Sequence, residues 1–126
     1  MLLCILPSFY IVAEEKAENI DWVKLIQNAG TNYDMKMKAS EGIKELNSRI
    51  DSIIHDAKSV LDEQAHKLLI LNQENWIKYS ESRASFTADA YRGGTHQGLS
   101  YGYAMINLQK LRIVELNEMI SEYNSP

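Results

Sequence analysis

The glycines of one turn-rich segment could bind an anion. Gly93, Gly94 and Gly98 lie close together, and backbone amides freed by glycine can hold a phosphate at the start of a helix. A phosphate-binding loop of the GxxxxGK[ST] type follows a strand, and the segment has neither that pattern nor a predicted strand before it. We therefore predict that the three glycines serve turns.

The histidines and carboxylates could supply metal ligands or acid–base catalysis. His55 and His66 are eleven residues apart, which is about 16 Å along a continuous helix and too far to share a metal. His96 stands alone in the glycine-rich segment. A glycosidase needs two carboxylates across a cleft, whereas the acidic residues here are spread over predicted solvent faces. The sequence therefore predicts no catalytic residue, no metal site and no cofactor.

The segment around the glycines has the composition of a recognition surface. Tyrosine, arginine and hydrogen-bonding side chains surround flexible glycines, a mixture that is common where proteins bind partners. The candidate partner-binding residues are Tyr91, Arg92, Thr95, His96, Tyr101 and Tyr103. The alternative is that these tyrosines pack against the ends of helices.

Composition and charge limit the class of protein. With 126 residues, of which 45% are hydrophobic and 24% charged, the chain suits one compact domain. Its 13 Lys and Arg against 17 Asp and Glu give a net charge of −4. This acidity argues against nucleic-acid binding and favours a basic partner.

The elements that would position these residues are helices. Asn19 to Gln27 predicts a short helix that leads into a turn-rich cluster at residues 28–32. From Asp34 onward apolar residues recur at spacings of three and four, as in an amphipathic helix that packs against others. That stripe comprises Ile43, Leu46, Ile50, Ile53, Ala57 and Val60. A break is expected near Ser59, with Ser59 and Asp62 capping a new helix, and a single bent helix is the alternative.

Two further stripes predict two further helices. The first comprises Leu61, Ala65, Leu68, Asn72, Trp76, Tyr79 and Arg83, with Trp76 and Tyr79 expected in the core. After a loop over Tyr91–Gly98, a last helix is expected from about Tyr101 to Glu122. Its stripe comprises Ile106, Ile113, Leu116, Ile120 and Tyr123, with polar Gln109 in one position. The sequence therefore predicts an all-α fold, a small antiparallel bundle of three to four helices with a Gly-rich loop before the last helix.

Two arginines fall near the predicted buried stripes. Arg83 and Arg112 would each need a carboxylate partner there, because an unpaired buried charge is costly. Glu115 and Glu74 are the candidates within reach on the predicted helices.

The amino end resembles an export signal. Residues 1–13 read MLLCILPSFYIVA, an uncharged apolar stretch that is too short for a membrane-spanning helix. A basic segment before it is missing, so either the chain start lies inside a longer signal or the stretch is a buried amino-terminal segment. Cys4 is the single cysteine, which excludes an internal disulfide. The predicted organisation is a signal peptide over 1–13, a short helix and linker over 14–33, and a helical domain over 34–123.

Four short motifs connect the chain to a known family. They are Leu46-Asn47, Gln73-x-x-Trp76, Gly93-Gly94-Thr95 and Arg112-x-x-Glu115-Leu116. Their order and spacing resemble the LprI-like lysozyme-inhibitor domain family of small exported bacterial proteins, over roughly residues 34 to 122. The resemblance implies an all-helical domain in the periplasm, on the cell envelope or secreted, with lysozyme inhibition attributed to at least one member.

Two departures from that family bear on stability and function. Relatives commonly carry a cysteine pair, and the resemblance places Ala84 and Ala104 at those positions. Relatives also tend to have an arginine where this chain has Ser80, and Arg83 lies one turn further on.

Three function classes follow. The first is an exported binding protein that inhibits a cationic lysozyme or another peptidoglycan hydrolase, with Arg92 and His96 near the enzyme's catalytic carboxylates and the tyrosines as anchors. The second is an envelope structural or assembly protein, or an immunity-like partner of another protein, which uses a helical face. An enzyme is the third. The oligomeric state stays open.

Overall fold

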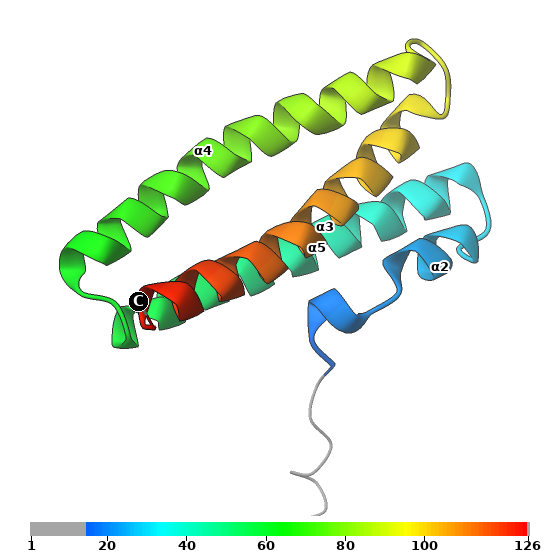
Figure 1. Ribbon diagram of the computed structural model, residues 1–126. Coiled ribbons are helices and arrows are strands. Elements are labelled where there is room, and N and C mark those ends of the chain that lie inside the picture. The colour runs from blue at the N-terminus through cyan, green and yellow to red at the C-terminus, as the bar shows by residue number, and fades with distance from the viewer. Residues whose placement is uncertain (1–14, 126) are drawn as a thin grey trace, which may run out of the picture.

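The computed structural model describes residues 15–125, and helices are its only regular elements there (Figure 1). Three long α-helices follow one another in antiparallel order, which confirms the predicted all-α bundle. The predicted signal peptide lies outside the described residues. The elements are η2 (Ala17–Asn19), α2 (Trp22–Gln27), α3 (Asn32–Asp56), η3 (Ala57–Ser59), α4 (Glu63–Ala88), η4 (Asp89–Tyr91) and α5 (Gln97–Tyr123).

Side-chain caps set where the long helices start. A capping box begins α3: the Asp34 amide donates to Thr31 Oγ1 at 3.1 Å, and Asp34 accepts from the Thr31 amide at 3.4 Å. The break predicted near Ser59 is confirmed, and the single bent helix is wrong. The capping residue of α4 is Asp62 alone, which accepts from the Ala65 amide at 2.8 Å. Ser59 instead donates to the Asp56 carbonyl.

The glycine-rich loop is shorter than predicted. Helix α5 begins at Gln97 rather than near Tyr101, so Gly98 lies inside the helix and is not a turn glycine. Gly93 is a turn glycine, because its positive φ of 76° is a conformation that favours glycine. The first short helix is also shorter than predicted, because the 3-10 turn η2 precedes α2 and a bend separates them.

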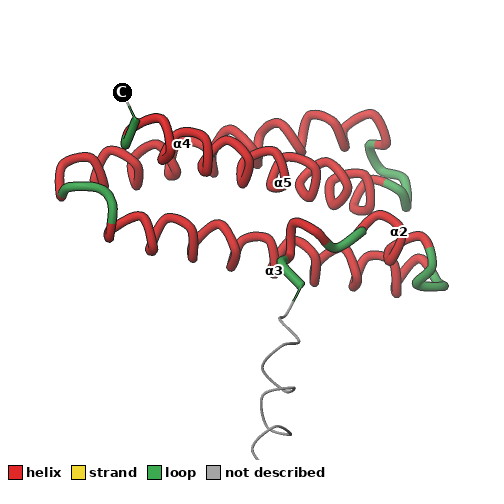
Figure 2. Tube along the Cα trace, turned by 60° about the horizontal axis from the view of Figure 1, so that its bottom comes forward, coloured by secondary structure: helices red, strands yellow, loops and turns green. Residues whose placement is uncertain are grey.

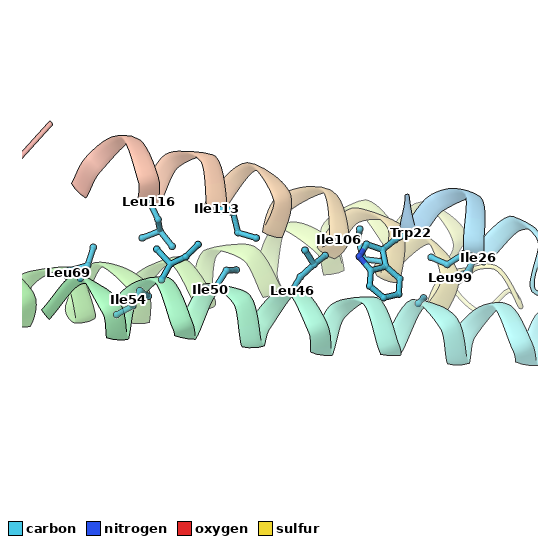
Figure 3. Close-up of a cluster of buried hydrophobic side chains, with 13 residues drawn as sticks. Trp22, Ile26, Leu46, Ile50, Ile54, Leu69, Leu99, Ile106, Ile113 and Leu116 are labelled. Carbon is cyan, nitrogen blue, oxygen red and sulfur yellow. The ribbon is translucent and has the colours of Figure 1, made fainter. Parts of the chain in front are cut away.

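The core forms where α3 packs against α5, with α2 across one end (Figure 3). The predicted stripes supply most of it: Leu46, Ile50, Ile53 and Ala57 from α3, and Ile106, Ile113 and Leu116 from α5. The prediction that Val60 and Tyr123 belong to the core is wrong, because both side chains are more than half exposed. A Cβ on Gly42 of α3 would lie 3.0 Å from the Trp22 ring, so this position needs glycine for the close approach of α2.

Helix α4 lies against α5 and makes few contacts with α3 (Figures 1 and 2). The predicted core stripe of α4 is displaced by one residue from the stripe that is buried. Leu68, Tyr79 and Arg83 are exposed, and Trp76 is partly buried. The buried seam comprises His66, Leu69, Gln73, Ser80, Ala84 and Ala88. Three of these side chains are polar, so the apolar spacing of α4 indicated the neighbouring face of the helix as the buried one.

Candidate functional site

Three of the six residues predicted to bind a partner lie together at the loop end of the bundle. Tyr91, His96 and Tyr103 line an open cavity of about 480 Å³, with Val23 from α2 beside them. The Tyr91 and His96 rings meet edge to face, with centroids 4.6 Å apart. The cavity wall contains Lys110 and no carboxylate.

The other three predicted residues lie outside that cavity. Arg92 donates to both carboxylate oxygens of Asp89, at 3.0 and 2.7 Å, and this raises the pKa of the Arg92 guanidinium. Burial, with the charge of Glu81, raises the pKa of the Tyr101 hydroxyl. Tyr101 and Tyr103 are two positions apart on α5, which directs them to nearly opposite sides. Thr95 is exposed in the turn.

The glycine-rich turn and the histidines have structural partners. The Gly93 amide donates to Gln97 Oε1 at 3.1 Å, so the loop closes on its own helix. His66 is buried and its Nε2 lies 2.9 Å from the Ile54 carbonyl oxygen. Within residues 15–125, no three His, Cys, Asp or Glu side chains lie close enough to hold a metal. No helix in the same range is long and apolar enough to cross a membrane.

A buried arginine joins α4 to α5. Arg112 is 3% exposed. Its Nε donates to Gln73 Oε1 at 2.9 Å, its Nη2 to Asn72 Oδ1 at 2.7 Å, and its Nη1 to Glu115 Oε1 at 2.5 Å. Its guanidinium carbon lies 5.7 Å from the centre of the Trp76 ring. Of the two carboxylates predicted as partners, Glu115 and Glu74, Glu115 is the one that pairs with Arg112.

Arg83 behaves differently from the prediction. It is exposed and donates to the Tyr79 hydroxyl at 2.9 Å rather than to a carboxylate. An arginine at the surface keeps its hydration, so it needs no counter-charge.

A second polar contact joins α5 to α3. Gln109 is fully buried, and its Nε2 donates to the Ile43 carbonyl at 3.0 Å and to Asn47 Oδ1 at 2.7 Å. Leu46 and Leu116 are fully buried in the core. The motif residues on the helices therefore hold the three long helices together.

The family profile described as "Lysozyme inhibitor LprI" matches residues 26–116, more than half of the chain. The chain belongs to this family. The match spans α3 and α4 completely, and α5 as far as Leu116, so the LprI domain contains every residue of the Arg112 contacts. No curated protein and no solved structure matches the chain.

The LprI domain also has a groove between α4 and α5 that sequence reasoning missed. Two adjoining cavities of about 280 and 510 Å³ share Asn72 and Met119 in their walls. We call this surface the α4–α5 groove. It is lined by Leu61, Ala65, Leu68, Leu69, Asn72, Asn75, Trp76, Tyr79, Arg83, Leu108, Leu111, Arg112, Glu115, Met119, Ile120 and Tyr123. The signal that could have found it is the misassigned stripe of α4, whose residues line the groove instead of the core.

Proposed function

We propose that this LprI domain is an exported, non-enzymatic protein that binds and inhibits a lysozyme or another peptidoglycan hydrolase. The family match over residues 26–116 carries the proposal. A domain that docks beside the cleft of such an enzyme inhibits it by excluding the polysaccharide. Export through residues 1–13 is part of the proposal, and amino-terminal sequencing of the protein recovered from the periplasm tests it.

The chemistry of the α4–α5 groove and of the cavity at the loop end supports binding rather than hydrolysis. The α4–α5 groove contains one carboxylate, Glu115, and Arg112 engages it. The cavity at the loop end contains none. General acid–base cleavage of a glycosidic bond needs a pair of carboxylates, and neither cavity supplies one.

The charge of the chain supports a basic target. Lysozymes that attack bacteria are usually cationic, and a net charge of −4 on the inhibitor accelerates their encounter. Association between opposite charges weakens as salt rises.

Lysis of bacterial cell walls by a panel of lysozymes and other peptidoglycan hydrolases tests the proposal. The purified protein is added at increasing concentration, at low and at near-physiological salt. We expect stoichiometric inhibition of at least one enzyme, with tighter binding at low salt. An absence of inhibition across the panel at micromolar protein contradicts the proposal.

The second candidate is an envelope structural or assembly protein, or an immunity-like partner of another protein. The exposed hydrophobic side chains of α4 favour it: Leu68, Leu71, Tyr79 and Phe86 are all at least half exposed. Light scattering over a range of concentrations tests self-association. A mass that rises with concentration supports this candidate, and a constant monomer mass counts against it.

A further inference from the structure

We infer that the α4–α5 groove, whose apolar half lies at the end where α5 terminates, is the surface on which this LprI domain docks a cationic hydrolase. The inference rests on the proposed function and names the surface that performs it. The rival surface is the cavity at the loop end, lined by Tyr91, His96 and Tyr103.

The groove has the composition of a protein interface. Leu68, Tyr79 and Leu111 are each more than half exposed, and Trp76 and Arg83 stand beside them. Aromatic and arginine side chains dominate the binding energy of protein interfaces, around an apolar centre. Exposed apolar side chains that lie together, with polar side chains around them, are a feature of interaction sites.

The charge of the chain is concentrated at the same end of the bundle. Residues 51–67 and 111–123 contain seven acidic and three basic side chains, a balance of −4. The remainder of the chain contains ten of each and is neutral. Figure 1 shows that these two segments meet where α3 leads into α4 and where α5 ends. The entire net charge therefore lies at the end that contains the apolar half of the groove.

The loop end lacks this attraction. Arg92 is neutralised by Asp89, and Lys110 is the charged residue in the wall of the rival cavity. The groove wall also contains a cation, Arg83, so the difference between the two surfaces lies in the acidic segments beside the groove and not in the walls themselves. Charge complementarity thus favours the groove, with Glu118 and Glu122 exposed on α5 beside it.

The groove is held in shape before a partner arrives. Arg112 fixes Glu115 through an ion pair and lies over the Trp76 ring, and both residues belong to the groove wall. A preorganised surface loses less side-chain freedom on binding. The partner that fits is a basic protein surface with a projecting apolar side chain.

Charge reversal with a matched control tests the inference. Glu118→Lys with Glu122→Lys changes the net charge by +4 beside the groove, and Glu41→Lys with Glu45→Lys makes the same change on α3. We expect the first pair to slow association with the inhibited enzyme by about ten-fold at low salt, because steering is lost. We expect the control pair to stay within about two-fold of the wild type.

Truncation of apolar side chains provides an independent test. Leu68→Ala with Tyr79→Ala removes apolar area from the groove, and we expect affinity to fall by about ten-fold or more. Phe86→Ala is the matched control, because Phe86 is 81% exposed and lies outside the groove lining. Far-ultraviolet circular dichroism and Tm verify that all variants are folded.

The outcomes separate the inference from the proposed function. Inhibition that is insensitive to the groove variants, and that falls in a Tyr91→Ala, His96→Ala variant, overturns the groove and supports the loop end. Binding through the groove without inhibition overturns the proposed function alone. A dimer that Leu68→Glu dissociates shows that a second copy occupies the groove, and this overturns the inference. If no enzyme of the panel binds, both fail.

Discussion

Replacing Arg112 by methionine tests whether the buried polar contacts stabilise the packing of α4 on α5. Methionine retains a long side chain and removes the charge and the donors. Gln73 is 7% exposed, so its Oε1 loses its partner without access to water. Asn72 and Glu115 are exposed, so their oxygens are rehydrated at little cost.

The expected loss can be worked from these contacts. A buried acceptor without a partner costs about 1–3 kcal/mol, and the lost cation–π contact with Trp76 adds about 0.5–1 kcal/mol. Arg112→Met should therefore lower the free energy of unfolding by about 1.5–4 kcal/mol. Glu115→Gln should cost less than about 1 kcal/mol, because the Glu115 side chain is 57% exposed.

Urea unfolding followed by circular dichroism measures these changes. In Arg112→Met, Gln73→Leu no buried acceptor is stranded, so the double variant should recover at least about 1 kcal/mol relative to Arg112→Met. Two results would refute the reasoning. One is an Arg112→Met protein within about 0.5 kcal/mol of the wild type, and the other is a double variant whose loss equals the sum of the single losses.

Three further predictions concern packing, pH and the family's cysteine positions. Gly42→Ala should destabilise the protein by about 1–3 kcal/mol in urea unfolding because its Cβ would meet the α2 indole ring at 3.0 Å. Gly98→Ala, whose Cβ meets only a lysine chain at 3.5 Å, should stabilise it by about 0.5–1 kcal/mol, and equal effects would contradict this packing. Burial alone would raise the pKa of Glu18, but its ion pair with α3 outweighs this and lowers the pKa. The contribution of the Glu18 carboxylate to stability is therefore present above the unfolded pKa of about 4.3 and is lost as pH falls through the folded pKa. In urea unfolding, Glu18→Gln should be destabilising at pH 7, and this difference should disappear as pH falls through the folded pKa of Glu18; a difference that persists in acid would count against it. Ala84→Cys with Ala104→Cys should form a disulfide under oxidising conditions and raise the free energy of unfolding by about 3 kcal/mol, whereas a variant that remains reduced, shown by thiol titration, would refute the pairing.

The sequence predicted the fold well where apolar side chains form the contact. The stripes of α3 and α5 lie in the core because one large interface buries both of them. The start of α5 was predicted less well, because Gly98 was assigned to the turn and lies inside the helix. A Cβ on Gly102 would lie 3.0 Å from the Ala39 Cβ. Close contact between two helices therefore accounts for that glycine, and a local pattern does not report such a contact.

The orientation of α4 could not be predicted from apolar spacing. Its buried face contains His66, Gln73 and Ser80, each with a hydrogen-bond partner. The partners of His66 and Gln73 lie on other helices, the Ile54 carbonyl on α3 and Arg112 on α5, whereas Ser80 donates to the Ile77 carbonyl within α4. Spacing along one helix contains no information about them.

The candidate site was predicted in part. The pairing of Arg112 with Glu115 follows from i, i+3 spacing on one helix. Tyr91, His96 and Tyr103 lie together, but whether they bind a partner stays a prediction. The groove was missed because its two walls come from helices whose relative rotation depends on the polar contacts.

The orientation of α4 links the stability of the LprI domain to its proposed binding surface. Gln73 can reach Arg112 only when it faces α5, and this rotation directs Leu68 and Tyr79 away from the core and into the groove. The polar contacts therefore create the exposed apolar surface that a partner would cover. Substitutions in the Arg112 contacts should alter both stability and affinity, because they release the rotation of α4. Substitutions of Glu118 and Glu122 should alter affinity alone, because these side chains are exposed and lie outside the contacts that hold α4.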